Sequence, residues 1–177
     1  SSFLSPSSSG LAPQGYTGAS GAYCTSCHLG NPRNATGGSV TVSGLPSSTY
    51  DASQMYNFSL TISHAAADRK RWGFSIKAVN NAGVAVGTFS SSNNNALVNG
   101  TELSHFNAPV TGSQASYSFN NLSWTAPANT TGDNSIIRFF FAGNAADESY
   151  SSSGDYIYSG MINITANSIP DRKSTRL

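Results

Sequence analysis

The chain has 177 residues and a mass of 18.4 kDa, which suits one domain with its own core and is too short for two. Ser, Thr, Asn and Gly supply 80 of the 177 residues, a mixture that disfavours long helices, and only 10% of the residues are charged, with a formal net charge of +1. This composition excludes a basic surface for nucleic acid or an anionic membrane, whereas 38% hydrophobic and 11% aromatic residues suffice for a β-sheet core.

Residues 1–22 are rich in Ser, Gly and Pro without periodicity, which predicts an extended N-terminal segment. The chain begins at Ser1 without Met or an apolar leader, so we expect a processed, exported product located outside the cell, at its surface or in the periplasm. No apolar run approaches the roughly 18 residues of a membrane-spanning helix, so none is expected.

The next segment, residues 23–38, holds both cysteines of the chain in the sequence Cys24-Thr-Ser-Cys27-His28. C-x-x-C-H is the attachment signature of c-type haem. Two thiols at this spacing reach the two vinyl groups of one porphyrin as thioethers, and the adjacent imidazole binds the iron as the proximal ligand. The motif therefore predicts one covalent haem c on Cys24 and Cys27, with His28 on the iron.

Two other uses of the motif stay open. A C-x-x-C disulfide can form in an oxidising compartment and leave the histidine incidental. A structural zinc site is the weaker alternative, because it needs a fourth nitrogen or sulfur ligand that only His64 or His105 could supply.

Residues 39–166 contain short β-type runs separated by turn residues, at the spacing of a sandwich or barrel of seven or eight strands. The clearest run is Met55–Ser63, where Tyr56, Phe58, Leu60 and Ile62 alternate with polar residues. The other runs are 40–45, 72–79, 84–89, 115–124, 135–142 and 156–165, and the secondary structure of 96–106 is left open. The turn at Asn80–Gly83 predicts that the runs on its two sides form a hairpin. Residues 167–177, with Pro170 and four charged residues, are expected to be a linker or tail.

A low-spin haem needs a second axial ligand, and the candidates are His64, His105, Met55 and Met161. Both methionines fall in predicted strands, so packing in the core explains them without iron. His64 follows the strand that ends at Ser63 and is interpreted as an exposed loop histidine. His105 lies in the segment 96–106, whose weak periodicity does not indicate a regular strand. Binding to the iron, rather than strand pairing, can therefore determine its position. We therefore predict His105 as the distal ligand, with His64 as the alternative.

Several short motifs, taken in order, resemble bacterial Reeler-like (reelin-domain-like, choice-of-anchor V) exported proteins. The resemblance implies an immunoglobulin-like antiparallel β-sandwich behind one C-x-x-C-H, and it places His105 at the position of a histidine that the family keeps. It covers residues 21–166 and rests on YCTSCHLGNP (23–32), RWGF (71–74), GTF (87–89), LSH (103–105), LSWTAP (122–127), AGNAA (142–146) and SGDYIY (153–158).

Two functions follow from these observations. The first is an exported monohaem c-type cytochrome domain that transfers single electrons to a redox partner protein. The alternative is an extracellular structural or adhesive β-sandwich module, such as a filament subunit, in which haem is secondary or absent. Its extended N-terminal segment could pair with the sheet edge of a neighbouring copy and form a homo-polymer. We expect no enzyme activity, because the chain has no G-x-S-x-G elbow and no distinct carboxylate pair.

Overall fold

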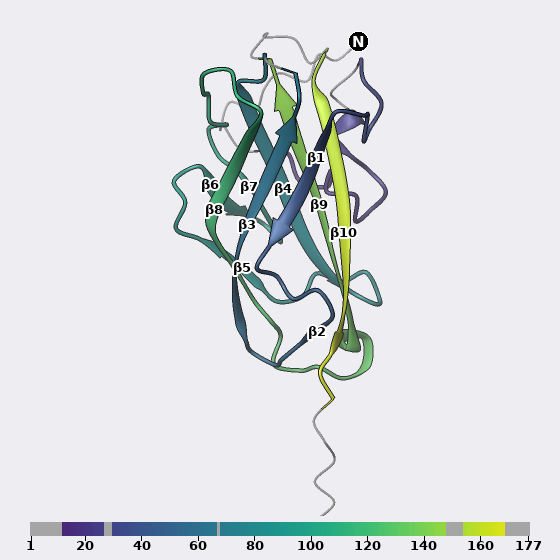
Figure 1. Ribbon diagram of the computed structural model, residues 1–177. Helices are drawn as coiled ribbons and strands as arrows, with labels where there is room; N and C mark the ends of the chain where they lie inside the picture. The colour runs from purple at the N-terminus through teal and green to yellow at the C-terminus, as the bar shows by residue number, and fades with distance from the viewer. Residues whose placement is uncertain (1–11, 27–29, 67, 148–153, 169–177) are drawn as a thin grey trace, which may run out of the picture.

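The computed structural model describes residues 12–26, 30–66, 68–147 and 154–168, and the strands among them form two β-sheets that face each other (Figure 1). The strands are β1 (Gly38–Ser43), β2 (Thr49–Tyr50), β3 (Met55–His64), β4 (Arg71–Asn80), β5 (Thr88–Ser91), β6 (Ala96–Asn99), β7 (Glu102–His105), β8 (Ser116–Thr125), β9 (Ile136–Ala146) and β10 (Tyr156–Ala166). Two 3-10 turns, η1 (Cys24–Ser26) and η2 (Gly132–Ser135), complete the assigned elements.

One sheet has four strands in the order β1-β3-β8-β5, and the other has six in the order β2-β10-β9-β4-β7-β6. The strand pairs are antiparallel except that β2 runs parallel to β10. This architecture confirms the predicted all-β, immunoglobulin-like sandwich. The described residues contain ten strands rather than seven or eight, because two-residue and four-residue strands such as β2, β6 and β7 are too short to show a period of two.

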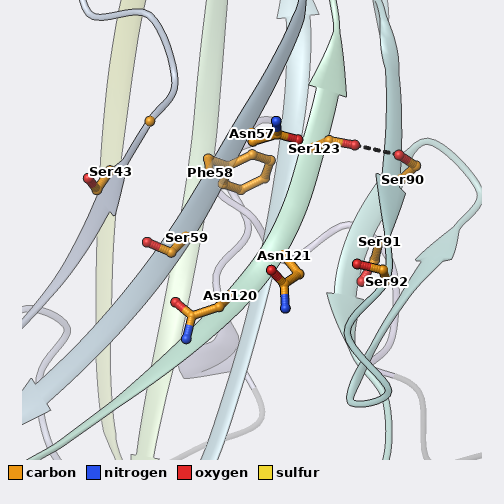
Figure 2. A pocket seen from close by; sticks show the side chains of 11 residues that line it. Ser43, Asn57, Phe58, Ser59, Ser90, Ser91, Ser92, Asn120, Asn121 and Ser123 are labelled. Carbon is orange, nitrogen blue, oxygen red and sulfur yellow. Dashed lines mark hydrogen bonds between the residues drawn. The ribbon is translucent and has the colours of Figure 1, made fainter.

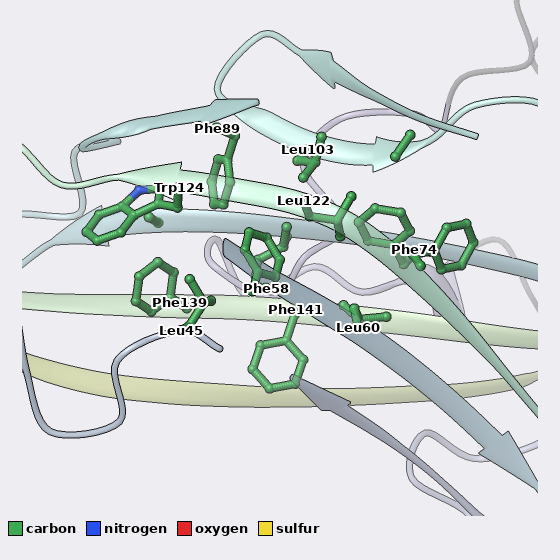
Figure 3. Close-up of a cluster of buried hydrophobic side chains, with 14 of the residues drawn as sticks. Leu45, Phe58, Leu60, Phe74, Phe89, Leu103, Leu122, Trp124, Phe139 and Phe141 are labelled. Atoms are coloured by element: carbon green, nitrogen blue, oxygen red, sulfur yellow. The ribbon is translucent and has the colours of Figure 1, made fainter. Parts of the chain in front are cut away.

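The core lies between the two sheets and is dominated by aromatic rings (Figure 3). Phe74 of the six-stranded sheet meets Phe119 of the four-stranded sheet with ring centroids 4.5 Å apart, and Trp124 meets Phe139 at 4.7 Å. These four rings are almost completely buried. Alternation along β3 puts Phe58, Leu60 and Ile62 into the same core, as the sequence predicts. Tyr56 of β3 and Ile162 of β10 pack against this core and are half-buried.

The predicted hairpin around Asn80–Gly83 forms only as one antiparallel residue pair, with backbone hydrogen bonds from Asn80 N to Val84 O and from Val86 N to Ala78 O. β4 belongs to the six-stranded sheet and β5 to the four-stranded sheet, and only the isolated bridge between Val79 and Ala85 follows the turn. The chain crosses between sheets at Gly87, whose φ is +74° and whose position would bring a Cβ against the Trp124 ring. Only glycine fits both conditions, so this residue allows the crossover.

No helix in the described part of the chain is long and apolar enough to cross a membrane.

Candidate haem-attachment site

Residues 12–26, which we call the N-terminal strap, lie on the outer face of the six-stranded sheet. The Gly15 N–H donates to the Glu102 carboxylate on β7, with N and Oε1 2.9 Å apart. The Gln14 amide donates to the Asn99 side chain on β6 over 3.1 Å. The strap is therefore anchored along the β6–β7 edge of the sheet.

The strap reverses direction just before the cysteine motif. Thr17 and Tyr23 form an antiparallel bridge around a turn in which Gly18 and Gly21 have φ values of +97° and +81°. Glycine adopts these left-handed conformations without steric cost. The turn leads directly into η1, so it determines where Cys24 lies.

His105 ends β7, and backbone atoms of β4 hold its ring. The Nδ1 atom lies 3.0 Å from the Phe74 nitrogen and 3.2 Å from the Phe74 carbonyl oxygen. In one tautomer Nδ1 accepts from the N–H, and in the other it donates to the carbonyl and leaves Nε2 as the basic nitrogen that a metal requires. The ring covers Gly73, where a Cβ would come 2.8 Å from Cε1 and Nδ1.

Cys24 and His105, which are far apart in the sequence, line the same cavity of about 70 Å³ between strap and sheet. The strap contributes Pro13, Tyr16 and Cys24 to its wall, and the sheet contributes Ser75, His105 and Asn144. The fold thus brings one predicted thioether residue and the predicted distal ligand together.

The donor types at this cavity fit haem c, because a thiol and an imidazole held by a backbone group are the side chains that such a haem uses. The cavity is smaller than cofactor sites, which measure about 300–1,000 Å³. A haem at this place would therefore need the strap to lie further from the sheet.

The other two residues of the motif, Cys27 and His28, lie outside the described residues. Within the described ranges, no three His, Cys, Asp or Glu side chains are grouped so that they could hold a metal ion.

His64 does not line the cavity, and its interpretation as an exposed loop histidine is wrong. It is the last residue of β3, is 5% exposed and lies against the Tyr156 ring with centroids 3.9 Å apart. The Ala66 N–H donates to its Nδ1 over 2.9 Å, while its Nε2 has no hydrogen-bond partner among the described residues. Burial, together with the nearby Arg69 cation, lowers the pKa of His64.

Burial also corrects the interpretation of the two methionines and shows that one cation is buried. Met55 and Met161 are each 53% exposed, so they are not core residues, and neither lines the cavity. Arg69, in a polar run that suggests an exposed loop, is 3% exposed and donates to the carbonyl groups of Ala145 and Gly154. Its guanidinium group also donates to the carboxylate of the neighbouring Asp68, with Nη2 and Oδ2 2.9 Å apart.

No family model and no curated protein matches the chain. Among solved structures, it is similar to a cohesin module of a Clostridium perfringens family 33 glycoside hydrolase at 12% identity, over 75% of this chain and 100% of that one, with a TM-score of 0.42. It is similar to AvmM, which catalyses macrocyclization in alchivemycin A biosynthesis, at 8% identity over 78% and 92%, with a TM-score of 0.46. A DUF4466 family protein from Parabacteroides merdae matches at 11% identity with a TM-score of 0.42, where the alignment covers 71% of this chain and 43% of that one.

Similarities at this level carry no argument about function. None of the three proteins is described as Reeler-like or as a cytochrome, so the resemblance drawn from the motifs stays a prediction.

Proposed function

We propose that the chain is an exported monohaem c-type cytochrome module of the Reeler-like kind that transfers single electrons to a protein partner. Cys24 and Cys27 would hold the haem as thioethers, and His28 and His105 would bind its iron. When bound, the haem supplies reversible one-electron exchange. The observation that carries the proposal is the shared cavity of Cys24 and His105, since a C-x-x-C-H motif alone does not require a histidine from β7 beside it.

The residues around His105 have a defined part in this function. In the tautomer in which Nδ1 donates to the Phe74 carbonyl, Nε2 would be the nitrogen that binds iron. Gly73 leaves room for the His105 ring, because a Cβ at this position would come 2.8 Å from two ring atoms.

The test is expression with c-type haem-maturation machinery. We expect Soret and α bands that sharpen with dithionite, an intact mass increased by one haem, and haem that stays on the polypeptide during acid-acetone extraction. His105→Ala should convert the low-spin spectrum to a high-spin or water-ligated one and leave the covalent haem in place, while the matched variant His64→Ala keeps the low-spin spectrum. The reverse pattern would move the distal ligand to His64, and free thiols without a Soret band would end the haem proposal.

The alternative is an extracellular structural or adhesive module, and the small volume of the cavity favours it. The cavity between the strap and the sheet measures about 70 Å³, which is too small for a porphyrin. In this second function the strap is a permanent part of the sandwich and covers Gly73 and Ser75. A matured protein without haem that keeps its strap protected from proteolysis would support it.

A further inference from the structure

The outer face of the four-stranded sheet is uncharged. Its strands, β1, β3, β5 and β8, contain no Asp, Glu, Lys or Arg. The six-stranded sheet, by contrast, carries charged residues in β4, β7 and β9. Neutrality is thus a property of one side of the molecule, which we call the hydroxyl face.

Hydroxyl groups on this face lie in rows across the strands. Thr41, Thr61 and Ser118 are register partners on β1, β3 and β8, and the Thr61 and Ser118 hydroxyl oxygens are 2.7 Å apart. A second pair, Ser90 of β5 and Ser123 of β8, is hydrogen-bonded over 2.5 Å. Adjacent strands are about 4.8 Å apart, so the rows repeat donors and acceptors at regular spacing.

A β-bulge hollows the centre of the face into a trough of about 790 Å³ (Figure 2). The register shifts between Phe58 and Leu60, so that Asn120 and Asn121 together oppose Ser59. Asn121 has a φ of +59°, as a residue in such a bulge requires. The trough is wide open to solvent and is lined chiefly by Ser and Asn side chains.

The lining restricts which ligand can bind. Arg and Lys side chains make the strongest hydrogen bonds to a phosphate or carboxylate ligand, and neither residue lines the trough. Protein interfaces are built around aromatic and Arg side chains, but the single aromatic residue of the lining, Phe58, is only 4% exposed. Hydroxyl and amide groups can each donate and accept, which matches the hydroxyl groups of a sugar.

We propose that the trough on the hydroxyl face binds a strand of a neutral polysaccharide. The trough lies on the four-stranded sheet, whereas the haem-attachment cavity lies on the outer face of the six-stranded sheet. The two sites are therefore independent, and this proposal stands whether or not the chain carries haem.

The test measures binding of the full chain, produced in bacteria, to neutral cello-, malto- and N-acetylchito-hexaose, with anionic polygalacturonate as the comparison. We expect saturable calorimetric binding to at least one neutral hexaose and none to polygalacturonate. Asn120→Lys should weaken that binding about tenfold or more, because it removes an amide and fills the trough. The matched variant Asn163→Lys, an exposed Asn on β10 of the other sheet, should bind like wild type.

Asn121→Gly keeps the test valid if Asn120→Lys does not fold. Glycine suits a φ of +59°, so this variant retains the bulge while it removes an amide from the trough, and it should also bind more weakly. The proposal is overturned if no neutral hexaose binds, if polygalacturonate binds equally well, or if folded trough variants bind as tightly as Asn163→Lys.

Discussion

Gly73 controls the position of His105, although it carries no side chain of its own. Its neighbours Trp72 and Phe74 fill the core, so Gly73 faces outward toward the strap. The His105 ring occupies the space where any other residue would place its Cβ, and the backbone of Phe74 fixes the orientation of the ring. The position of His105, the proposed distal ligand on β7, therefore depends on a glycine on β4.

Gly73→Ala tests this dependence. The new Cβ would lie 2.8 Å from two ring atoms, so His105 must turn away, and the overpacking should lower the free energy of unfolding by about 1–3 kcal/mol. Nuclear magnetic resonance of the His105 ring should show a clear shift, and the haem-loaded protein should lose low-spin character. Gly112→Ala is the control, because a Cβ there meets nothing within 4 Å. Unchanged His105 signals in Gly73→Ala would contradict this account.

At the scale of elements, the strap is held by few bonds, and one of them is sensitive to pH. Glu102 is 2% exposed, and burial raises its pKa above the ordinary value of 4.5, although the Gly15 N–H and the Lys77 cation oppose the rise. A carboxyl with a raised folded-state pKa stabilises fully below its unfolded value, and this contribution is lost as pH rises through the folded-state value. Glu102 therefore stabilises the folded protein less as pH rises, even though the hydrogen bond from the strap's Gly15 N–H favours the ionised carboxylate.

Glu102→Gln should remove this pH dependence. Glutamine keeps an oxygen acceptor for the Gly15 N–H and carries no charge to bury. We expect wild type and variant to have similar free energies of unfolding near pH 4, with the variant becoming progressively more stable than wild type toward pH 8. Urea titrations across this range measure the difference. The exposed Asp133→Asn is the control, and a constant gap between Glu102→Gln and wild type would disprove the role of burial.

Elements differ in how well the sequence predicts them. The alternation in β3 predicts both the strand and its buried face, because ten residues contain several repeats of the two-residue period. The Asn80–Gly83 turn cannot reveal that the next strand joins the other sheet, since a local turn carries no information about tertiary pairing. The cysteine motif can be recognised in the sequence because the spacing of its two thiols is the one that covalent haem attachment uses. The proximity of Cys24 to His105 cannot be predicted in this way, because it depends on where the strap lies on the folded sheet.

For the whole molecule, the aromatic core couples the two faces that carry the two proposed sites. Phe74 is on the sheet beneath the strap, and Phe119 is on the sheet that carries the trough. Their rings are tilted by 47° and are 3% and 0% exposed, so each is fixed by the other sheet. Side chains from both sheets pack together in one core. We therefore expect the sandwich to unfold as one cooperative unit.

A double-mutant cycle measures this coupling. Phe74→Ala and Phe119→Ala should each lower the free energy of unfolding by about 3–5 kcal/mol, because each leaves a cavity between the sheets. The double variant should lose about 0.5–1.5 kcal/mol less than the sum, which is the value of an aromatic pair beyond its buried area. Phe74→Ala combined with Val84→Ala, at a loop residue that is 60% exposed, should be additive. Additive losses for the two phenylalanines, or separate unfolding transitions by tryptophan fluorescence and circular dichroism, would show that the sheets are held together by other contacts.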